Sequence, residues 1–142
     1  MATPTAAQQD ALVRAATAAR ERAYAPYSGF AVGAALLTSA GEIVAGCNVE
    51  NISYGLTNCA ERTAVFAARA GGKLGPPPDG PTIVAVAVVA EGTAPPSPCG
   101  ACRQVLHEFG PDCAVIMATP RGARRVTTLA ALLPEAFGPW TP

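Results

Sequence analysis

Three cysteines and one glutamate stand out in this sequence, because their spacing could build a metal centre with an acid–base group beside it. Cys99 and Cys102 follow Pro98 at the start of a predicted helix, where residues three apart share one face. A helix N-terminus lowers the pKa of a thiol and favours the thiolate that a metal ion needs. Alone, this pair fits equally well a redox dithiol, two buried reduced cysteines or half of a structural zinc site.

A third cysteine narrows these choices. Cys59 precedes Glu61 by two residues at the start of another predicted helix. Three thiolates leave the fourth tetrahedral position of zinc open for water, whereas a structural site fills it with a further Cys or His, so Glu61 would be the base for that water. Zinc nucleobase deaminases carry His-x-Glu, or Cys in place of His, followed by Pro-Cys-x-x-Cys. The pattern Cys59-x-Glu61 with Pro98-Cys99-x-x-Cys102 matches that signature.

Two arginines directly follow residues of this group, Arg62 after Glu61 and Arg103 after Cys102. Three thiolates on one divalent cation carry a formal charge of −1, which makes the metal a poorer acid toward its bound water. We therefore expect Arg62 and Arg103 to donate hydrogen bonds or positive charge to the thiolates. The alternative for either arginine is an ordinary salt bridge at the surface or at an interface.

The other two cysteines and the single histidine are expected to lie outside the metal site. Cys47 and Cys113 fall in predicted strands and are interpreted as small buried side chains. His107 comes five residues after Cys102 on the same predicted helix and faces another direction, so we predict a packing or surface role. A fourth ligand from Cys47 or Cys113 would weaken the catalytic interpretation.

The apolar pattern predicts helices that alternate with strands and so position these residues. The predicted helices cover residues 5–24, 57–70 with Thr57 or Asn58 as its cap, 99–110, and a last turn or two over 128–133. The predicted strands cover residues 30–38, 42–49, 82–90, 113–118, and an edge strand over 124–127. The first two strands form a hairpin, and strands alternating with helices after a hairpin indicate an α/β fold, a mixed sheet with helices on both faces.

Length and charge exclude several classes of function. The chain has 142 residues, the length of one ordinary domain, and 10 Lys and Arg balance 10 Asp and Glu. This balance provides no basic field for nucleic acid and no polybasic patch for a membrane surface. Charged residues make up only 14% of the chain, against roughly 25% in typical domains, which suggests surface buried in an oligomer.

The sequence gives no sign of export or membrane insertion. Its longest apolar run, residues 83–90, is far shorter than the ~20 residues that span a bilayer. The first 20 residues lack the continuous apolar stretch of a secretory signal, and closely spaced cysteines suit a reducing compartment. We therefore expect a cytoplasmic protein.

Four segments make the chain resemble the cytidine deaminases of the small, homotetrameric type that bind zinc through three cysteines. The segments are residues 27–36 (YSGFAVGAAL), 48–51 (NVEN), 54–64 (YGLTNCAERTA) and 98–106 (PCGACRQVL). The resemblance spans nearly the whole chain. It implies a single domain, residues 1–142, with the three-layer α-β-α fold of that family around a mixed five-stranded sheet.

The same resemblance implies a reaction. One zinc ion per chain, held by Cys59, Cys99 and Cys102, would activate water for the hydrolytic deamination of cytidine and 2′-deoxycytidine, a step of pyrimidine salvage. Glu61 would take the proton of that water and deliver protons to the ring N3 and to the departing amine. The products are uridine or 2′-deoxyuridine and ammonia.

Substrate-binding residues are also implied by the resemblance. Asn48 and Glu50 would hydrogen-bond the ribose 3′-hydroxyl, Phe30 would pack against the base, and Ala60 would contact the substrate. Tyr54 and Phe137 are candidates for a wall shared between subunits of a homotetramer, with the tail of about residues 134–142 packed at the interface. The alternative for Phe137 is a local anchor of the tail.

Two other functions stay open at this point. One is deamination of another cytosine nucleoside such as blasticidin S, although the pair of Asn48 and Glu50 favours a simple ribonucleoside. The other is a non-enzymatic zinc-stabilised module or a dithiol redox protein built on Cys99 and Cys102. A closed metal site predicts no exchangeable water, and a redox pair predicts reversible disulfide formation with loss of metal.

Overall fold

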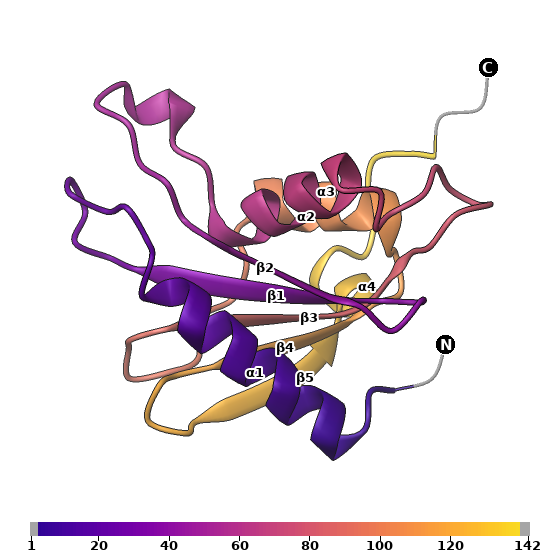
Figure 1. The fold of residues 1–142 in the computed structure, drawn as a ribbon, viewed down its shortest axis with the longest axis horizontal. Helices are drawn as coiled ribbons and strands as arrows, with labels where there is room; N and C mark the ends of the chain where they lie inside the picture. The colour runs from indigo at the N-terminus through magenta and orange to yellow at the C-terminus, as the bar shows by residue number, and fades with distance from the viewer. Residues whose placement is uncertain (1–2, 140–142) are drawn as a thin grey trace.

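A mixed five-stranded sheet forms the centre of the computed structural model, which describes residues 3–139 (Figure 1). The strands lie in the order β2-β1-β3-β4-β5. They are β1 (Val32–Thr38), β2 (Ile43–Cys47), β3 (Ile83–Ala90), β4 (Ala114–Ala118) and β5 (Arg124–Thr128). β3 and β4 run parallel, and the other neighbouring pairs are antiparallel. The mixed sheet and the hairpin that the sequence predicts are confirmed.

Helices cover both faces of this sheet. The helices are α1 (Ala6–Arg20), α2 (Ala60–Ala70), α3 (Gly100–Phe109) and the short α4 (Leu129–Leu132), with a 3-10 turn η1 (Tyr54–Leu56). α1 packs on β1, β2 and β3 from one side, and α2 and α3 lie together on the other (Figure 1). The predicted three-layer α-β-α arrangement is therefore confirmed. No helix among the described residues is long and apolar enough to cross a membrane.

The two faces of the sheet carry side chains of different size. On β3, Val86 and Val88 point into the core beneath α2 and α3, whereas Ala85 and Ala87 point toward α1. Successive side chains of a strand point to opposite faces, so the apolar run predicted as a doubly buried strand supplies both cores. The alanine face lets α1 come close to the sheet.

A glycine sets the distance between α2 and the sheet. A Cβ added to Gly46 of β2 would lie 2.5 Å from the backbone nitrogen of Ala64, so any larger residue would push the helix away. The bridge between Val49 and Asn58, with two N–H···O bonds of 2.9 Å, then closes the loop that leads into α2. Together these contacts place the first turn of α2 beside the end of β2.

Two predicted helix boundaries need correction. α1 ends at Arg20 and not at residue 24, because Tyr24 pairs with the chain after β2, donating to the Asn48 carbonyl and accepting from the Glu50 N–H. The helix predicted to start at a Thr57 or Asn58 cap instead has Cys59 as its N-cap. Asn58 is held in the bridge to Val49 and is not free to cap the helix.

Candidate active site

The three candidate metal ligands come together where two helices begin. Cys59 is the N-cap of α2, Cys99 is the N-cap of α3, and Cys102 lies in the first turn of α3. Their sulfur atoms all lie within 4.8 Å of one another. Neither N-cap thiol hydrogen-bonds the backbone of its own helix, so both remain available as ligands. Sulfurs at this spacing fit a tetrahedral zinc ion with Zn–S bonds of about 2.3 Å.

Hydrogen bonds favour a thiolate in this cluster. The pKa of the Cys59 thiol is lowered to about 5, first by a hydrogen bond from Cys102 and then by Arg62, although partial burial opposes the shift. The same bond to Cys59, together with burial, raises the pKa of the Cys102 thiol. The Arg62 Nη2 donates to the Cys59 sulfur at 3.0 Å, which places this guanidinium where it could support a thiolate. The Arg62 Nε is buried without an acceptor among residues 3–139.

Glu61 contributes a buried carboxyl group beside the thiols. It lies in the first turn of α2, and only 4% of its surface is exposed. Burial raises its pKa above the ordinary carboxyl value, since removal from water disfavours the charged form. A buried carboxyl group with a raised pKa holds a proton more readily than an exposed one, which suits a group that must both accept and return a proton.

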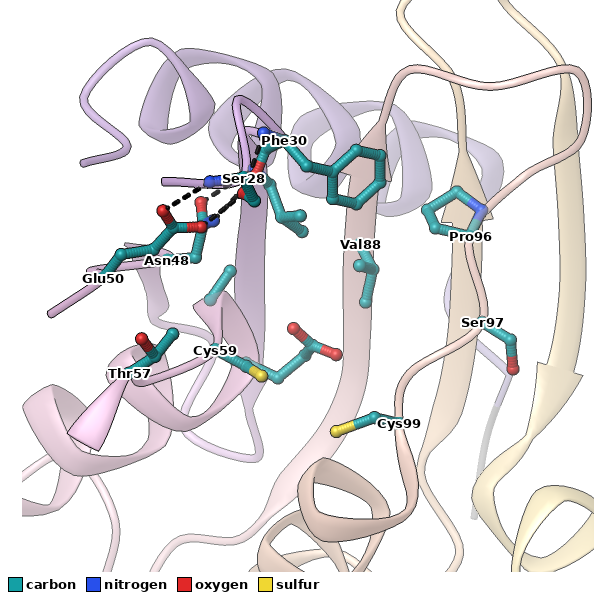
Figure 2. A pocket seen from close by; sticks show the side chains of 13 residues that line it. Ser28, Phe30, Asn48, Glu50, Thr57, Cys59, Val88, Pro96, Ser97 and Cys99 are labelled. Carbon is teal, nitrogen blue, oxygen red and sulfur yellow. Dashed lines mark hydrogen bonds between the residues drawn. The ribbon is translucent and has the colours of Figure 1, made fainter. Parts of the chain in front are cut away.

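A pocket of about 260 Å³ connects these groups to the surface (Figure 2). Its lining comes from the ends of β1 and β2, the start of α2, strand β3 and the segment before α3. The lining residues are Ser28, Phe30, Val32, Asn48, Glu50, Thr57, Cys59, Ala60, Glu61, Val88, Pro96, Ser97 and Cys99. Figure 2 shows Cys59 and Cys99 at one end, with Phe30 and Glu50 at the other. A pocket of this size suits a small molecule better than a polymer.

Asn48 fixes the backbone on the side of the pocket away from the metal cluster. Its Oδ1 accepts from the Val32 N–H at 2.9 Å, and its Nδ2 donates to the Phe30 carbonyl at 2.8 Å. The residue is 8% exposed. Its carboxamide therefore holds the chain that enters β1 as well as facing the pocket.

Glu50 organises the turn that carries Phe30. Its Oε1 accepts from the backbone N–H groups of Tyr27 and Ser28 at 2.9 and 3.0 Å, and its Oε2 accepts from the Ser28 hydroxyl. The Ser28 hydroxyl also accepts from the Phe30 N–H at 3.0 Å. The bonds from Ser28, together with that from Tyr27, lower the pKa of the Glu50 carboxyl group and keep it ionised.

The remaining predicted substrate residues divide into two groups. Phe30 and Ala60 line the pocket, as the resemblance implies. Tyr54 lies in η1 with its ring centroid 5.7 Å from that of Tyr27, beside an adjoining hollow. Phe137 is 84% exposed. Neither Tyr54 nor Phe137 lines the pocket of its own chain.

Arg103 is placed differently from the sequence expectation. Its guanidinium donates to the Pro98 carbonyl at 2.7 Å, to the Leu132 carbonyl at 2.7 Å and to the Ser97 hydroxyl at 2.8 Å. It forms no hydrogen bond to a thiol among the described residues, because the acceptors before α3 and at the end of α4 take its donors. Of the two roles expected for Arg103, a hydrogen bond to a thiolate or a supply of positive charge, the hydrogen bond is therefore not formed within residues 3–139.

The other sulfur and imidazole groups lie away from the cluster. Cys47 is half-buried in β2, and Cys113 is buried just before β4, where burial raises its thiol pKa to about 12. His107 lines a hollow at the far end of α3 with Pro111 and Asp112. Within residues 3–139, the cluster that could hold a metal contains Cys59, Cys99 and Cys102 only.

Several pocket residues were not predicted from the sequence as site residues. Ser28, Thr57, Pro96 and Ser97 line the pocket. Ser28 and Thr57 lie in segments that carry the family resemblance, which is a weak signal for them. Pro96 and Ser97 look like ordinary loop residues, and only their proximity to Cys99 could have suggested a role.

Comparisons with known proteins identify the family that this chain resembles. Residues 6–119 match the family model described as the cytidine and deoxycytidylate deaminase zinc-binding region. The chain is 50% identical over 127 residues to a cytidine deaminase of Halalkalibacterium halodurans, covering 89% of this chain and 91% of the relative.

Solved structures with a similar fold are also cytidine deaminases. The fold matches a crystal structure of cytidine deaminase from Burkholderia pseudomallei with a TM-score of 0.83 and 54% identity, covering 90% of this chain and 98% of that one. It also matches the cytidine deaminase of Mycobacterium tuberculosis with a TM-score of 0.75 and 45% identity, covering 92% and 97% of the two chains.

Proposed function

The chain belongs to the cytidine and deoxycytidylate deaminase family, and we propose that it catalyses the zinc-dependent hydrolytic deamination of cytidine and 2′-deoxycytidine. The products are uridine or 2′-deoxyuridine and ammonia. One observation carries the proposal: the sulfurs of Cys59, Cys99 and Cys102 lie within 4.8 Å of one another, and two of them, Cys59 and Cys99, line the same pocket as the buried Glu61 carboxyl group, whose pKa is raised. The similarity to proteins named cytidine deaminase supports the choice of nucleoside.

Cys59, Cys99 and Cys102 are the residues that would hold one zinc ion per chain. The donor set fits zinc, because thiolate sulfur binds it strongly and the sulfurs already lie within 4.8 Å of one another. With three protein ligands, bound zinc keeps one position for water and lowers the pKa of that water. The Arg62 guanidinium offsets part of the charge on the Cys59 sulfur.

Glu61 moves the protons of the reaction. Its carboxylate accepts a proton from the water whose oxygen attacks C4 of the cytosine ring, and it delivers that proton to ring N3. It then takes the remaining proton of the former water and passes it to the amine as the bond from C4 to that nitrogen breaks. Ammonia leaves, and the new oxygen remains on C4 as the carbonyl of the uracil product.

The opposite side of the pocket recognises the nucleoside in this proposal. Asn48 and Glu50 face the pocket and keep lone pairs beyond those used within the chain, so they can bind the ribose 3′-hydroxyl. Phe30 packs against the base, and Ala60 contacts the substrate at the start of α2. The neutral chain, with 10 basic and 10 acidic residues, favours a small nucleoside over nucleic acid.

We further propose a homotetramer in which Tyr54 and Phe137 complete pockets of neighbouring subunits. Both side chains are largely exposed in the single chain, as a shared wall requires. The tail of about residues 134–142 would pack at this interface, although residues 140–142 lie outside the described structure. A single domain over residues 1–142 and a cytoplasmic location complete the proposal. Light scattering tests the assembly, and a stable active monomer would refute the shared wall.

The function is tested by following the ultraviolet absorbance of cytidine in the presence of purified protein, with a zinc determination on the same sample. We expect loss of cytidine absorbance, release of ammonia and about one zinc per chain. 2′-Deoxycytidine and blasticidin S should be tested in parallel, and turnover of blasticidin S alone would overturn the substrate assignment. One zinc per chain with no turnover of any of the three would indicate a structural metal.

A further inference from the structure

Arg103 contacts three consecutive residues that lead into the metal cluster. Its Nε donates to the Pro98 carbonyl at 2.7 Å, its Nη2 donates to the Ser97 hydroxyl at 2.8 Å, and its backbone N–H donates to the Cys99 carbonyl at 3.0 Å. Among the described residues, no other hydrogen bond reaches the Ser97 hydroxyl or the Pro98 carbonyl. One side chain therefore holds the segment that ends in a candidate ligand.

The third arm of the guanidinium reaches a different part of the fold. Nη1 donates to the Leu132 carbonyl at 2.7 Å, at the C-terminal end of α4. Leu129 of the same short helix is fully buried in the core beneath α2 and α3. The segment before Cys99 is thus tied through Arg103 to an element that the core already fixes.

We propose that Arg103 is a positioning residue that holds Cys99, and the Ser97 side of the pocket, in place for metal binding, because its side chain clamps residues 97 and 98, directly before Cys99, to α4. This inference rests on the proposed zinc site. It assigns to Arg103 a role different from supplying charge to the thiolates, because its donors are used on neutral oxygen acceptors.

The position of Cys99 depends on such a clamp more than the positions of the other two ligands do. Cys59 follows a residue bridged to Val49, and Cys102 is buried within the first turn of α3. Cys99 is exposed and precedes its helix as the N-cap, so its sulfur moves whenever residues 97–98 move. Figure 2 shows Ser97 and Cys99 on this segment as it runs into α3. Partners that orient metal ligands in this way typically change metal affinity 10–100-fold.

A lysine in place of Arg103 separates the effect of its hydrogen-bond geometry from the effect of its charge. A planar guanidinium presents five N–H donors in a fixed fork and can reach three acceptors that lie in different directions. A lysine ammonium keeps the positive charge, but it is a compact point at the end of a flexible stem and cannot span all three acceptors. Arg103→Lys therefore removes the clamp and keeps the charge, whereas Arg103→Met removes both.

The test measures the rate at which the zinc-loaded, full-length protein releases zinc to an excess of a coloured chelator, well below the unfolding temperature of each variant. We expect both Arg103→Lys and Arg103→Met to release zinc about 10-fold faster than the unchanged protein. Ser97→Ala, which removes one of the three contacts, should give a smaller increase. Arg69→Met is the matched control, because Arg69 donates to the Leu74 carbonyl at the opposite end of α2.

The outcomes separate this inference from the proposed function. A wild-type release rate in Arg103→Lys, with faster release only in Arg103→Met, would show that charge and not the clamp is needed. Equal acceleration in Arg69→Met would show a general loss of stability and overturn the inference. If the unchanged protein bound no zinc, the proposed function itself would fail. A pH profile of kcat that matches the unchanged enzyme in zinc-saturated Arg103→Lys is the further expected result, because no proton-transferring group is altered.

Discussion

The two ends of the pocket use their polar side chains differently. The metal end, made of Cys59, Glu61, Cys99 and Cys102, gathers three thiols and a buried carboxyl group, and the pKa values of Cys59, Glu61 and Cys102 depart from their ordinary values. The recognition end, made of Ser28, Phe30, Asn48 and Glu50, has side-chain donors and acceptors that are bonded to the backbone of the same chain. We expect the metal end to carry out the chemistry and the recognition end to hold the shape of the pocket wall.

From this difference we expect substitutions at the two ends to change different properties of the protein. The thiols and the buried carboxyl group at the metal end lie where a metal ion and its bound water would react, so their loss should affect turnover more than stability. Backbone-bonded groups hold the wall of the pocket, so their loss should affect both stability and substrate affinity.

The largest effect is expected from removing a thiol at the metal end. Cys102→Ala should reduce zinc well below one ion per chain and abolish detectable turnover, because two thiolates hold zinc poorly. Cys113→Ala is the control, since Cys113 is also buried but lies outside the cluster. It should keep zinc and activity and lose only about 1 kcal/mol of stability. Equal zinc loss in both variants would mean that zinc binding does not depend specifically on the thiol of Cys102.

Glu61→Gln should have the next largest effect, and it should act on turnover alone. The amide cannot accept and return a proton, so kcat is expected to fall roughly 10³–10⁴-fold while zinc content and KM change little. Steady-state kinetics with a zinc determination on the same preparation checks this. Activity within 10-fold of the unchanged enzyme would remove Glu61 from the mechanism.

At the recognition end, Asn48→Ala should show a mixed effect. Two partly buried backbone groups, the Val32 N–H and the Phe30 carbonyl, lose their partner, which costs about 1 kcal/mol of stability. KM for cytidine should rise about 10-fold, whereas kcat at saturation should fall much less than in Glu61→Gln. Urea denaturation together with kinetics tests this. If Asn48→Ala lowered kcat and left both KM and stability unchanged, Asn48 would act in the chemical step and not in holding the pocket wall.

The smallest expected effect concerns the acid stability of the recognition end. Because the pKa of Glu50 is lower in the folded chain than its ordinary value of 4.5, ionised Glu50 stabilises the fold above that pH. The contribution is lost as the pH falls through the lowered pKa. The difference in unfolding free energy between the unchanged protein and Glu50→Gln should therefore shrink as the pH falls below 4.5. A difference that stays constant as the pH falls below 4.5 would contradict the stabilising role of ionised Glu50.

The residues of the metal end could be predicted from the sequence because short-range patterns, residue spacing and helix starts, mark them. Two ligands and the carboxyl group lie at helix starts that the apolar pattern marks, and the spacing of Cys99 and Cys102 fixes their shared face. The mixed sheet followed from the order of strands and helices. The contribution of Arg62 could be predicted because it lies one turn after Cys59 on the same helix.

The recognition end was harder to read because its contacts are distant in sequence. Glu50 bonds to Ser28 across 22 residues. The same difficulty arises beside the metal end, where Arg103 reaches Leu132 across 29 residues. Nothing in local spacing distinguishes a bond to a sulfur from a bond to a carbonyl in such cases. The same limit explains the misplaced cap of α2, since the bridge of Asn58 to Val49 depends on tertiary structure.

The central claim is that three thiolates from this chain hold a zinc ion whose remaining position is open to water. X-ray absorption at the zinc edge of the purified, active protein tests it most directly. The account predicts three sulfur neighbours at about 2.3 Å and one oxygen neighbour. Four sulfur neighbours, or three sulfurs with a protein nitrogen and no exchangeable oxygen, would mean a closed structural site and would contradict the proposed catalysis.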